Sequence, residues 1–173
     1  NQVQTARIMA NGDLLYHDGL YMSALQADGS YDFTENFTYV KPWLKQADLV
    51  LGDFEGTINP DYPLSGYPLF NAPQSVTAAI SDAGYDVMDL THNHILDSGL
   101  EGAFTTADAF KEVGIDPVGV YENPVRDKAP LFIKNVNGIK VAILSYAYGF
   151  NGLESNLTEK EIANHLSNLD ENG

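Results

Sequence analysis

Short apolar runs alternate with amphipathic stretches along this chain, and the alternation predicts an α/β fold. The apolar runs predict four buried strands, at residues 7–10, 48–52, 85–90 and 116–120. Apolar residues at helical spacing, or a proline in a first turn, predict helices between these strands, at residues 39–46, 73–83 and 99–113. Gly84 and Gly114 directly follow the second and third of these helices, where glycine commonly ends a helix.

Asn137-Gly138 separates two more apolar runs, at residues 131–136 and 139–144. The pair predicts a β-hairpin, because both positions of such a tight turn require positive φ. A last helix is expected at residues 158–169, which open on a capping-box pattern, and the proline-rich residues 59–73 are expected to form a long surface loop. The whole pattern favours a mixed sheet with a parallel part and an added antiparallel hairpin.

Composition narrows the classes of partner. The 173 residues carry a formal net charge of −15, with 9 Lys and Arg against 24 Asp and Glu. Nucleic-acid binding needs a basic surface, so this balance argues against DNA or RNA, and it also disfavours docking on anionic lipid. No cysteine is present, which excludes disulfides and thiolate zinc sites. No run of about 18 apolar residues occurs, so no membrane-spanning helix is expected.

Three segments that follow predicted strands carry side chains suited to metal binding or catalysis. They are residues 12–18, 52–56 and 91–97, and three of the four histidines fall in the first and third of them. Sites in α/β proteins gather at the carboxyl ends of parallel strands, so we expect the three segments to face one another. Taken singly, an aspartate after a strand is more often a turn former or a helix cap than a ligand. The functional interpretation therefore depends on the combination.

The combination predicts a site for one or two divalent metal ions. Aspartate, asparagine and histidine side chains are accepted as ligands by Mn²⁺, Fe and Zn²⁺. Asp53 is the candidate to bridge two ions, which together could clamp both oxygens exchanged in a phosphoryl displacement. His94 is the candidate acid that neutralises the leaving oxygen.

In order and spacing, these segments resemble the CapA/PgsA family of bacterial capsule (poly-γ-glutamate) synthesis proteins. The matching residues are Gly12-Asp13 through His17, Ala47 through Gly56, Gly84 through Val87, Asn93-His94 and Asp97-Ser98-Gly99. The resemblance runs from about Ile8 to Ala147, and the ordered set is specific although no single motif is. It implies the fold of the calcineurin-like metallophosphoesterases, an α/β/β/α sandwich with mixed sheets.

The resemblance also implies roles for individual residues. It places a catalytic acid at His94 and metal ligands at Asp13, His17, Asp53 and Asn93. Side chains expected behind these ligands or against the substrate are Glu55, His92 and Asp97. The spacing of Asp13 and His17 is wider than the phosphoesterase Asp-x-His pattern. The family usually has asparagine where this chain has Asp53 and His92, and a carboxylate at position 53 strengthens the bridging role.

The family domain continues with further histidine motifs that this chain lacks. We therefore expect residues 1–173 to be the N-terminal portion of a single CapA-like domain, truncated at its C-terminus. His165, the remaining histidine, falls in the last predicted helix and is interpreted as a surface residue.

The resemblance implies an extracytoplasmic protein of capsule or poly-γ-glutamate synthesis with a phosphoesterase-like hydrolase site. The alternative is a non-catalytic polymer-binding or assembly module that keeps the phosphoesterase fold. Expected partners are an anionic polymer or a phosphoester substrate, and a membrane-bound polymer synthesis complex. The expected location is the cell surface, or the membrane through an N-terminal anchor that has been removed. The charge of −15 opposes a polyanionic substrate unless divalent ions reverse the local sign.

Overall fold

A parallel sheet forms the centre of the computed structural model, which describes residues 3–121 and 131–156. Its strands, in spatial order, are β1 (Ile8–Asp13), β2 (Leu49–Asp53), β3 (Val87–Asp89) and β4 (Asp116–Val118). All neighbours pair in parallel, so the carboxyl ends of the four strands lie at the same end of the sheet. The four predicted strands are thereby confirmed, each to within a few residues.

Helices connect consecutive strands. They are α1 (Asp18–Ser23), the 3₁₀ helix η1 (Thr34–Phe37) and α2 (Lys41–Leu44) before β2, α3 (Val76–Ala83) before β3, and α4 (Gly99–Glu112) before β4. The helices predicted at 73–83 and 99–113 are confirmed, and Gly84 ends α3 with a φ of 108°. The helix predicted at 39–46 is only four residues long, because α2 buries none of its side chains and packing does not extend it.

The two faces of the sheet bury different clusters of side chains. Along β2, Val50 belongs to the cluster on the helical side, whereas Leu49 and Leu51 belong to the cluster on the opposite face. The helical side holds the larger core, in which Met88 of β3 and Phe110 of α4 are fully buried. Apolar side chains at successive positions are typical of parallel strands that are covered on both faces.

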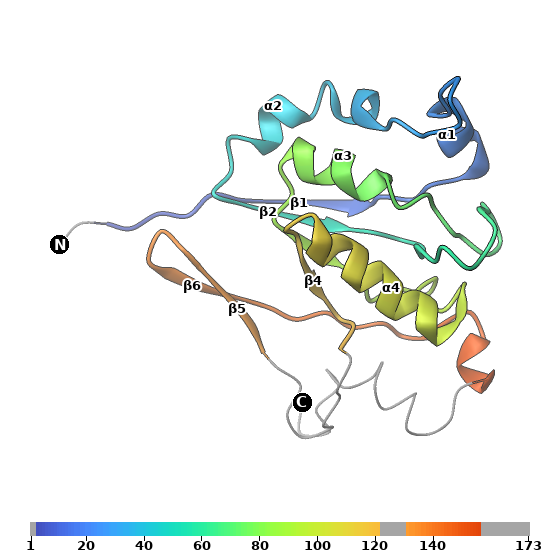
Figure 1. The fold of residues 1–173 in the computed structure, drawn as a ribbon. Coiled ribbons are helices and arrows are strands. Elements are labelled where there is room, and N and C mark those ends of the chain that lie inside the picture. Colours follow the sequence, from blue (N-terminus) through green and yellow to red (C-terminus); the bar gives the residue numbers. More distant parts are fainter. Residues whose placement is uncertain (1–2, 122–130, 157–173) are drawn as a thin grey trace.

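A hairpin of β5 (Phe132–Val136) and β6 (Ile139–Ile143) covers the opposite face. Figure 1 shows it on the other side of β1 and β2 from α2 and α3. Asn137 and Gly138 have φ values of 52° and 85°, as the predicted tight turn requires. Val136 packs with Val87 and Val118 of the parallel sheet.

The expectation of a mixed sheet is wrong. Within the described residues, β5 and β6 pair only with each other and form a second, antiparallel sheet. The physical reason is that the apolar face of the hairpin gains more by covering the exposed face of the parallel sheet than it would by extending the edge of that sheet.

The layers over residues 3–121 and 131–156 are therefore helices, parallel sheet and hairpin. This agrees with an α/β fold. The outer helical layer expected for a sandwich is not among these residues, and the helix predicted at 158–169 lies outside them. None of the described helices has the length and apolar character needed to cross a membrane.

Candidate functional site

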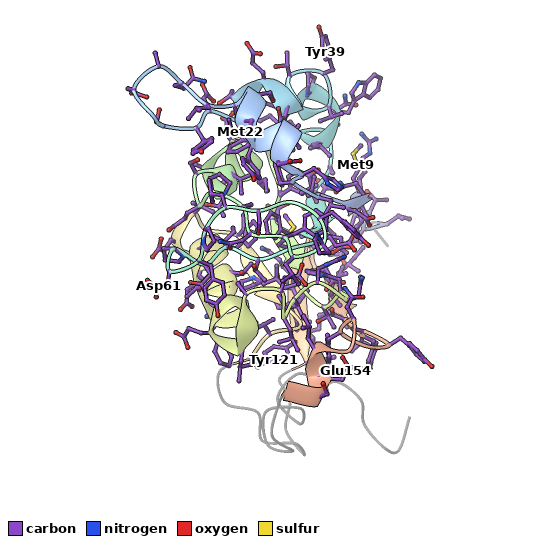
Figure 2. The ribbon with its side chains drawn as sticks, turned by 90° about the vertical axis from the view of Figure 1, so that its right-hand side faces the viewer. Met9, Met22, Tyr39, Asp61, Tyr121 and Glu154 are labelled. Carbon is purple, nitrogen blue, oxygen red and sulfur yellow. The ribbon has the colours of Figure 1, made fainter. Side chains whose placement is uncertain are left out.

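Three aspartates stand side by side at the carboxyl end of the sheet. Asp13, Asp53 and Asp89 are the last residues of β1, β2 and β3, and the strand register pairs Asp13 with Asp53 and Asp53 with Asp89. Adjacent strands lie about 4.8 Å apart, so these carboxylates occupy neighbouring positions. We call these three residues the aspartate row. Figure 2 views the molecule from this end.

The aspartate row extends the face of the sheet that the hairpin covers. Side chains alternate along a strand, so Asp53 lies on the same face as Leu49 and Leu51. The chain that leaves β6 passes this face, where the Ser145 hydroxyl donates a hydrogen bond to Asp89 Oδ1. The site is thus built between the end of the parallel sheet and the segment that follows the hairpin.

Asp53, at the centre of the row, is repelled by the acidic groups around it. Burial, followed by the charges of Asp89, Asp13 and Glu55, raises the pKa of Asp53 to about 7. Its Oδ1 atom is buried and has no hydrogen-bond partner. An unpartnered, buried carboxylate oxygen is costly, so positive charge at this point would be stabilising.

The neighbouring carboxyl groups are shifted in the same direction. Burial, followed by contact with Asp13, raises the pKa of Glu55. Burial also raises the pKa of Asp89, although hydrogen bonds from the Ser145 hydroxyl and the Thr91 N–H oppose that shift. The carboxyl groups of Asp53, Glu55 and Asp89 therefore all lose their protons less readily than the same groups would in water.

His94 lies beside these acids and is oriented by Asp97. His94 Nδ1 is 2.7 Å from Asp97 Oδ2, and His94 Nε2 is 4.0 Å from Glu55 Oε1. Asp97 Oδ2 also accepts a 2.6 Å hydrogen bond from the Phe70 N–H, and the Asp97 side chain is fully buried. The carboxylate therefore holds a proton on Nδ1 and leaves Nε2 facing the acidic groups.

The loop predicted at residues 59–73 forms one wall of the site. Asn71 ties the two ends of this loop together. Its Oδ1 accepts a 2.8 Å hydrogen bond from the Asn59 N–H, and its Nδ2 donates to the Asn59 carbonyl at 3.0 Å. The adjacent Phe70 ring packs edge-on against the rings of His94 and His17, with centroids 4.8 Å apart in both pairs. The loop is thus a tied element that contacts the candidate acid directly.

His92 is buried and supports the backbone of the site. Its Nδ1 accepts a 3.1 Å hydrogen bond from the His94 N–H, and its ring also hydrogen-bonds to the backbone of Phe54. Burial, followed by the neighbouring His94, lowers the pKa of His92 to about 3, so the ring is neutral at neutral pH. Its contacts connect the ends of β2 and β3.

Two of the predicted ligands make their contacts outside the aspartate row. His17 directly precedes α1, is exposed, and packs its ring on Phe70. Asn93 is also exposed, and its Nδ2 donates a 3.1 Å hydrogen bond to Asn151 Oδ1. Within the described ranges, no hydrogen bond joins either side chain to the row. Their role as ligands stays a prediction.

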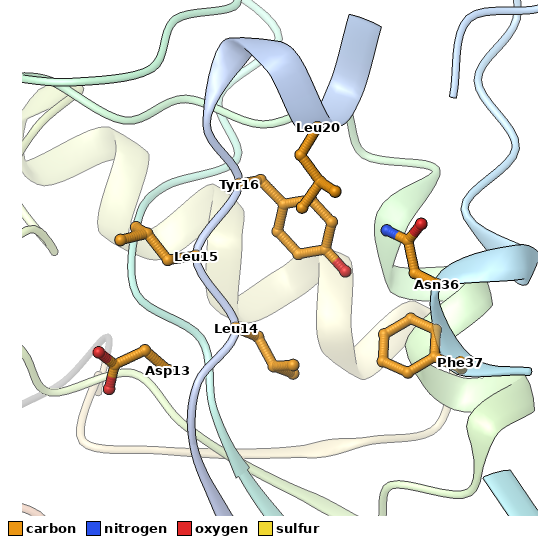
Figure 3. Close-up of a pocket in the computed structure, with 7 residues that line it drawn as sticks. All are labelled: Asp13, Leu14, Leu15, Tyr16, Leu20, Asn36 and Phe37. Atoms are coloured by element: carbon orange, nitrogen blue, oxygen red, sulfur yellow. The ribbon is translucent and has the colours of Figure 1, made fainter. Parts of the chain in front are cut away.

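A pocket of about 330 Å³ opens beside the end of β1. Its lining is mostly apolar and includes Tyr16, whose hydroxyl bonds the side chain of Asn36. Figure 3 shows Asp13 on the other side of the backbone from Tyr16 and Phe37, with its carboxylate pointing away from them. Asp13 thus borders the pocket, while its carboxylate points away from the apolar side chains that line it.

A comparison with protein families identifies the family of this chain. The family described as bacterial capsule synthesis protein PGA_cap matches residues 7–172. The chain belongs to this family. The match includes every element from β1 to the end of the described residues, and so covers the residues of the candidate site described above.

Curated relatives carry the names that the sequence resemblance implied. The chain is 34% identical over 119 residues to the capsule biosynthesis protein CapA of Bacillus anthracis, covering 66% of this chain and 29% of that protein. It is 26% identical over 113 residues to the PGA biosynthesis protein CapA of Bacillus subtilis, covering 64% and 30%. An uncharacterized protein of Sinorhizobium fredii, y4sH, is 26% identical over 157 residues, covering 87% and 32%. The chain thus spans only about 30% of the length of these relatives.

The donors of this PGA_cap site fit a divalent cation by their chemistry. Carboxylate oxygens are the ligands that hard cations prefer, and Asp53 Oδ1 is a buried one without a donor. Among the residues that the structure describes, no three histidine or acidic side chains already surround a common point as metal ligands would. Binding would therefore require the side chains of the row to turn toward the ion.

The sequence reasoning missed two residues of the PGA_cap site, Asp89 and Asn151. Asp89 had a signal, because it lies near the end of the strand predicted at residues 85–90, much as Asp53 directly follows the strand predicted at residues 48–52. Asn151 Nδ2 lies 3.4 Å from His94 Nδ1, and the residue has a φ of 55° in a turn before Gly152. The Asn-Gly pair indicates a turn, but only long-range packing brings that turn to His94.

Proposed function

We propose that this PGA_cap chain carries a phosphoesterase-like site that depends on a divalent metal, and that it acts outside the cytoplasmic membrane in the synthesis of a poly-γ-glutamate-type capsule. The observation that carries the proposal is the aspartate row next to a histidine held by a buried aspartate. Membership of the family supports the capsule role, and the names of the two Bacillus relatives support the type of polymer.

In this proposal the acidic groups bind the metal ion, and the ion binds the phosphoryl group of the substrate. Asp13 and Asp53 would hold the ion, with Asn93 and His17 as further ligands from the neighbouring loops. A bound divalent ion supplies positive charge that polarises the oxygens of a phosphoryl group. By holding the ion, the residues of the row would also fix the position of the phosphoester relative to the imidazole of His94.

His94 accounts for the proton transfer. Its Nε2 faces the acidic groups and gives its proton to the leaving oxygen. Asp97, bonded to Nδ1, stabilises the positive charge of the imidazolium before the transfer and keeps the ring in place. Phe70 contributes its N–H to Asp97 and its ring to one side of His94, which limits the access of water.

The charge of the chain makes cation binding a condition for catalysis. A net charge of −15 repels a phosphoester or a polyglutamate chain, and the acidic groups beside His94 repel it most at short range. Divalent ions bound at the row would offset this negative charge locally. An anionic substrate is therefore expected to reach His94 only in the metal-loaded protein.

A hydrolysis assay on the intact protein tests the proposal. Metal-stripped protein is reloaded with Mn²⁺, Fe²⁺ or Zn²⁺, the bound metal is measured by elemental analysis, and hydrolysis of bis(p-nitrophenyl) phosphate is followed. Asp53→Asn is expected to lose bound metal, and His94→Gln is expected to keep the metal and lose turnover. Asp108→Asn, which alters an exposed carboxylate paired with Lys111 on α4, is the matched control and should change neither.

The same assay decides between the catalytic role and the alternative. Intact protein that binds none of these ions and hydrolyses no phosphodiester would reject the catalytic proposal. A non-catalytic polymer-binding or assembly role would then describe the chain better.

A further inference from the structure

A larger pocket, of about 460 Å³, lies between the loop after β3 and the segment after β6. Thr91 to Asn93 line one side, Tyr146 to Asn151 line the other, and Glu154 of η2 (Leu153–Asn156) completes the lining. Small-molecule sites commonly measure about 300–1,000 Å³, so this space suits an organic ligand better than a lone ion.

The pocket adjoins the candidate catalytic histidine. Asn93 Nδ2 donates to Asn151 Oδ1 at 3.1 Å, which connects the two sides of the pocket. Asn151 Nδ2 in turn lies 3.4 Å from His94 Nδ1. A ligand bound to these two carboxamides would therefore lie next to the ring of His94, on the side of its Nδ1 atom.

The polar groups of the lining favour an uncharged ligand. They comprise two carboxamides, two phenols, the Thr91 hydroxyl, the His92 imidazole and one carboxylate, and the lining contributed by the described residues includes no lysine or arginine. An anion placed here would lose hydration without gaining a cation. The carboxylate of Glu154 is already engaged, because its Oε2 accepts a 3.2 Å hydrogen bond from the Phe150 N–H. Hydroxyl groups both donate and accept hydrogen bonds, so they match carboxamides in a way that charged groups do not.

Two tyrosines supply an apolar surface beside these carboxamides. Tyr146 and Tyr148 line the pocket, and their relative exposures are 50% and 111%. Exposed aromatic rings are stabilised when the apolar face of another ring covers them. A sugar ring combines a face of C–H groups with a rim of hydroxyls. It therefore matches the tyrosines and the carboxamides at the same time, whereas a purely apolar ring would match only the tyrosines.

We propose that this pocket binds a neutral sugar unit, and that the substrate of the site is therefore a phosphoester of a carbohydrate. The sugar ring packs on Tyr148, and its hydroxyls bond Asn93 and Asn151. The phosphoester part of this inference rests on the proposed function, whereas the sugar site stands on the pocket alone.

Direct binding measurements on the intact, metal-free protein test the sugar site. The probes are glucose, N-acetylglucosamine and their β-1,4-linked disaccharides, with γ-glutamylglutamate as the anionic probe and ethylammonium as the cationic one. Binding is followed by calorimetry and by NMR shifts. At least one saccharide is expected to bind, and the γ-glutamyl and ammonium probes are not.

Variants of the lining locate the binding. Tyr148→Ala removes the stacking surface and should weaken saccharide binding by about 3- to 10-fold. Asn151→Gly removes a carboxamide, tolerates the φ of 55° at this position, and should weaken binding as well. Tyr39→Ala is the matched control, because Tyr39 is also exposed and lies at the opposite end of the molecule from Glu154 (Figure 2). Its affinity should equal that of the unaltered protein.

The outcomes separate this inference from the proposed function. Saccharide binding in a protein that hydrolyses no phosphodiester would reject the proposed function and retain the sugar site. Three outcomes would overturn the sugar site: no saccharide binds, the γ-glutamyl or ammonium probe binds in place of the saccharides, or Tyr148→Ala and Asn151→Gly leave the saccharide affinity unchanged.

Discussion

Asp97 accepts a 2.7 Å hydrogen bond from His94 Nδ1 and thereby decides which nitrogen of the imidazole faces the acidic groups. The same oxygen of Asp97 accepts the Phe70 N–H, so one buried carboxylate joins the loop at residues 59–73 to the candidate acid. Burial raises the pKa of Asp97, and the contacts with Phe70 and His94 oppose that shift. Replacing Asp97 should therefore affect both the orientation of His94 and the attachment of the loop at residues 59–73.

Asp97→Asn is expected to lower the kcat of phosphodiester hydrolysis by about 10²-fold or more. The amide oxygen can still accept the Phe70 N–H, but the negative charge that stabilises the imidazolium is gone. Turnover of the metal-loaded intact protein measures the effect, and bound metal should stay constant. Asp61→Asn, at an exposed position of the same loop, is the control. Equal kcat values in Asp97→Asn and the unaltered protein would contradict the assignment.

The metal-free protein is expected to lose stability as the pH rises. Folding raises the pKa of Asp53 from 3.8 to about 7, so the folded state binds this proton more tightly than the unfolded state does. The resulting stabilisation is complete below about pH 4 and is lost as the pH rises through 7. Glu55 and Asp89, whose pKa values are also raised, act in the same direction.

Urea unfolding at pH 5 and pH 8 measures this dependence. Because Asp53 is partly exposed and water screens its charge, we expect a loss of about 1–2 kcal/mol between the two. Asp53→Asn should flatten the profile, since an amide does not titrate. A protein that is equally stable at both values, or more stable at pH 8, would show that the acids do not repel one another as described.

Divalent ions are expected to restore the lost stability at pH 8. An ion that binds only the folded state at about 100 times its Kd stabilises it by about 2.7 kcal/mol. Thermal unfolding of the intact protein with and without Mn²⁺ measures the shift in Tm, and Mg²⁺ provides a comparison with a harder ion. Asp53→Asn should respond much less than Asp108→Asn. The same Tm shift in both variants would place the ion elsewhere.

Gly119→Ala is expected to destabilise the fold by about 2–4 kcal/mol. Gly119 has a φ of 96°, and a Cβ at this position would lie 1.6 Å from Thr91 Oγ1 and 2.8 Å from Ser145 Oγ. Gly29→Ala is the matched control, because its φ is 87° and no atom lies within 4 Å of the added Cβ. It should cost only about 1 kcal/mol of backbone strain. Equal losses in the two variants, measured by urea unfolding, would show that Thr91 and Ser145 move aside.

The sequence predicted the sheet well because parallel strands buried on both faces leave unbroken apolar runs, as residues 49–51 do. It also predicted that Asp13 and Asp53 would meet, since strand ends converge in any parallel sheet. The hairpin was predicted correctly from Asn137-Gly138, but its place in a mixed sheet was predicted wrongly, because a turn signal says nothing about which surface the strands cover.

The individual positions of His92, His94 and Asn151 at the candidate site depend on tertiary packing, which no local sequence pattern predicts. His92 and His94 are two residues apart and look alike in sequence. Yet burial holds His92 neutral between backbone groups, whereas His94 keeps a nitrogen toward the acids. Asn151 reaches His94 across 57 positions of the chain, through the docking of the segment that follows β6. Such contacts follow from tertiary structure and could not be predicted from spacing.

The docking of that last segment has a consequence for how the protein matures. The hydrogen bonds of Ser145 with Asp89 and of Asn151 with Asn93 join positions separated by 56 and 58 residues, and β1 is more distant still. Contacts of this kind form late, since a long stretch of chain must be synthesised and ordered first. A nascent chain that has not yet extended to Ser145 therefore lacks both contacts, and Asp89 stays more open to water. The structure in this way makes completion of the candidate site depend on the segment that follows the hairpin.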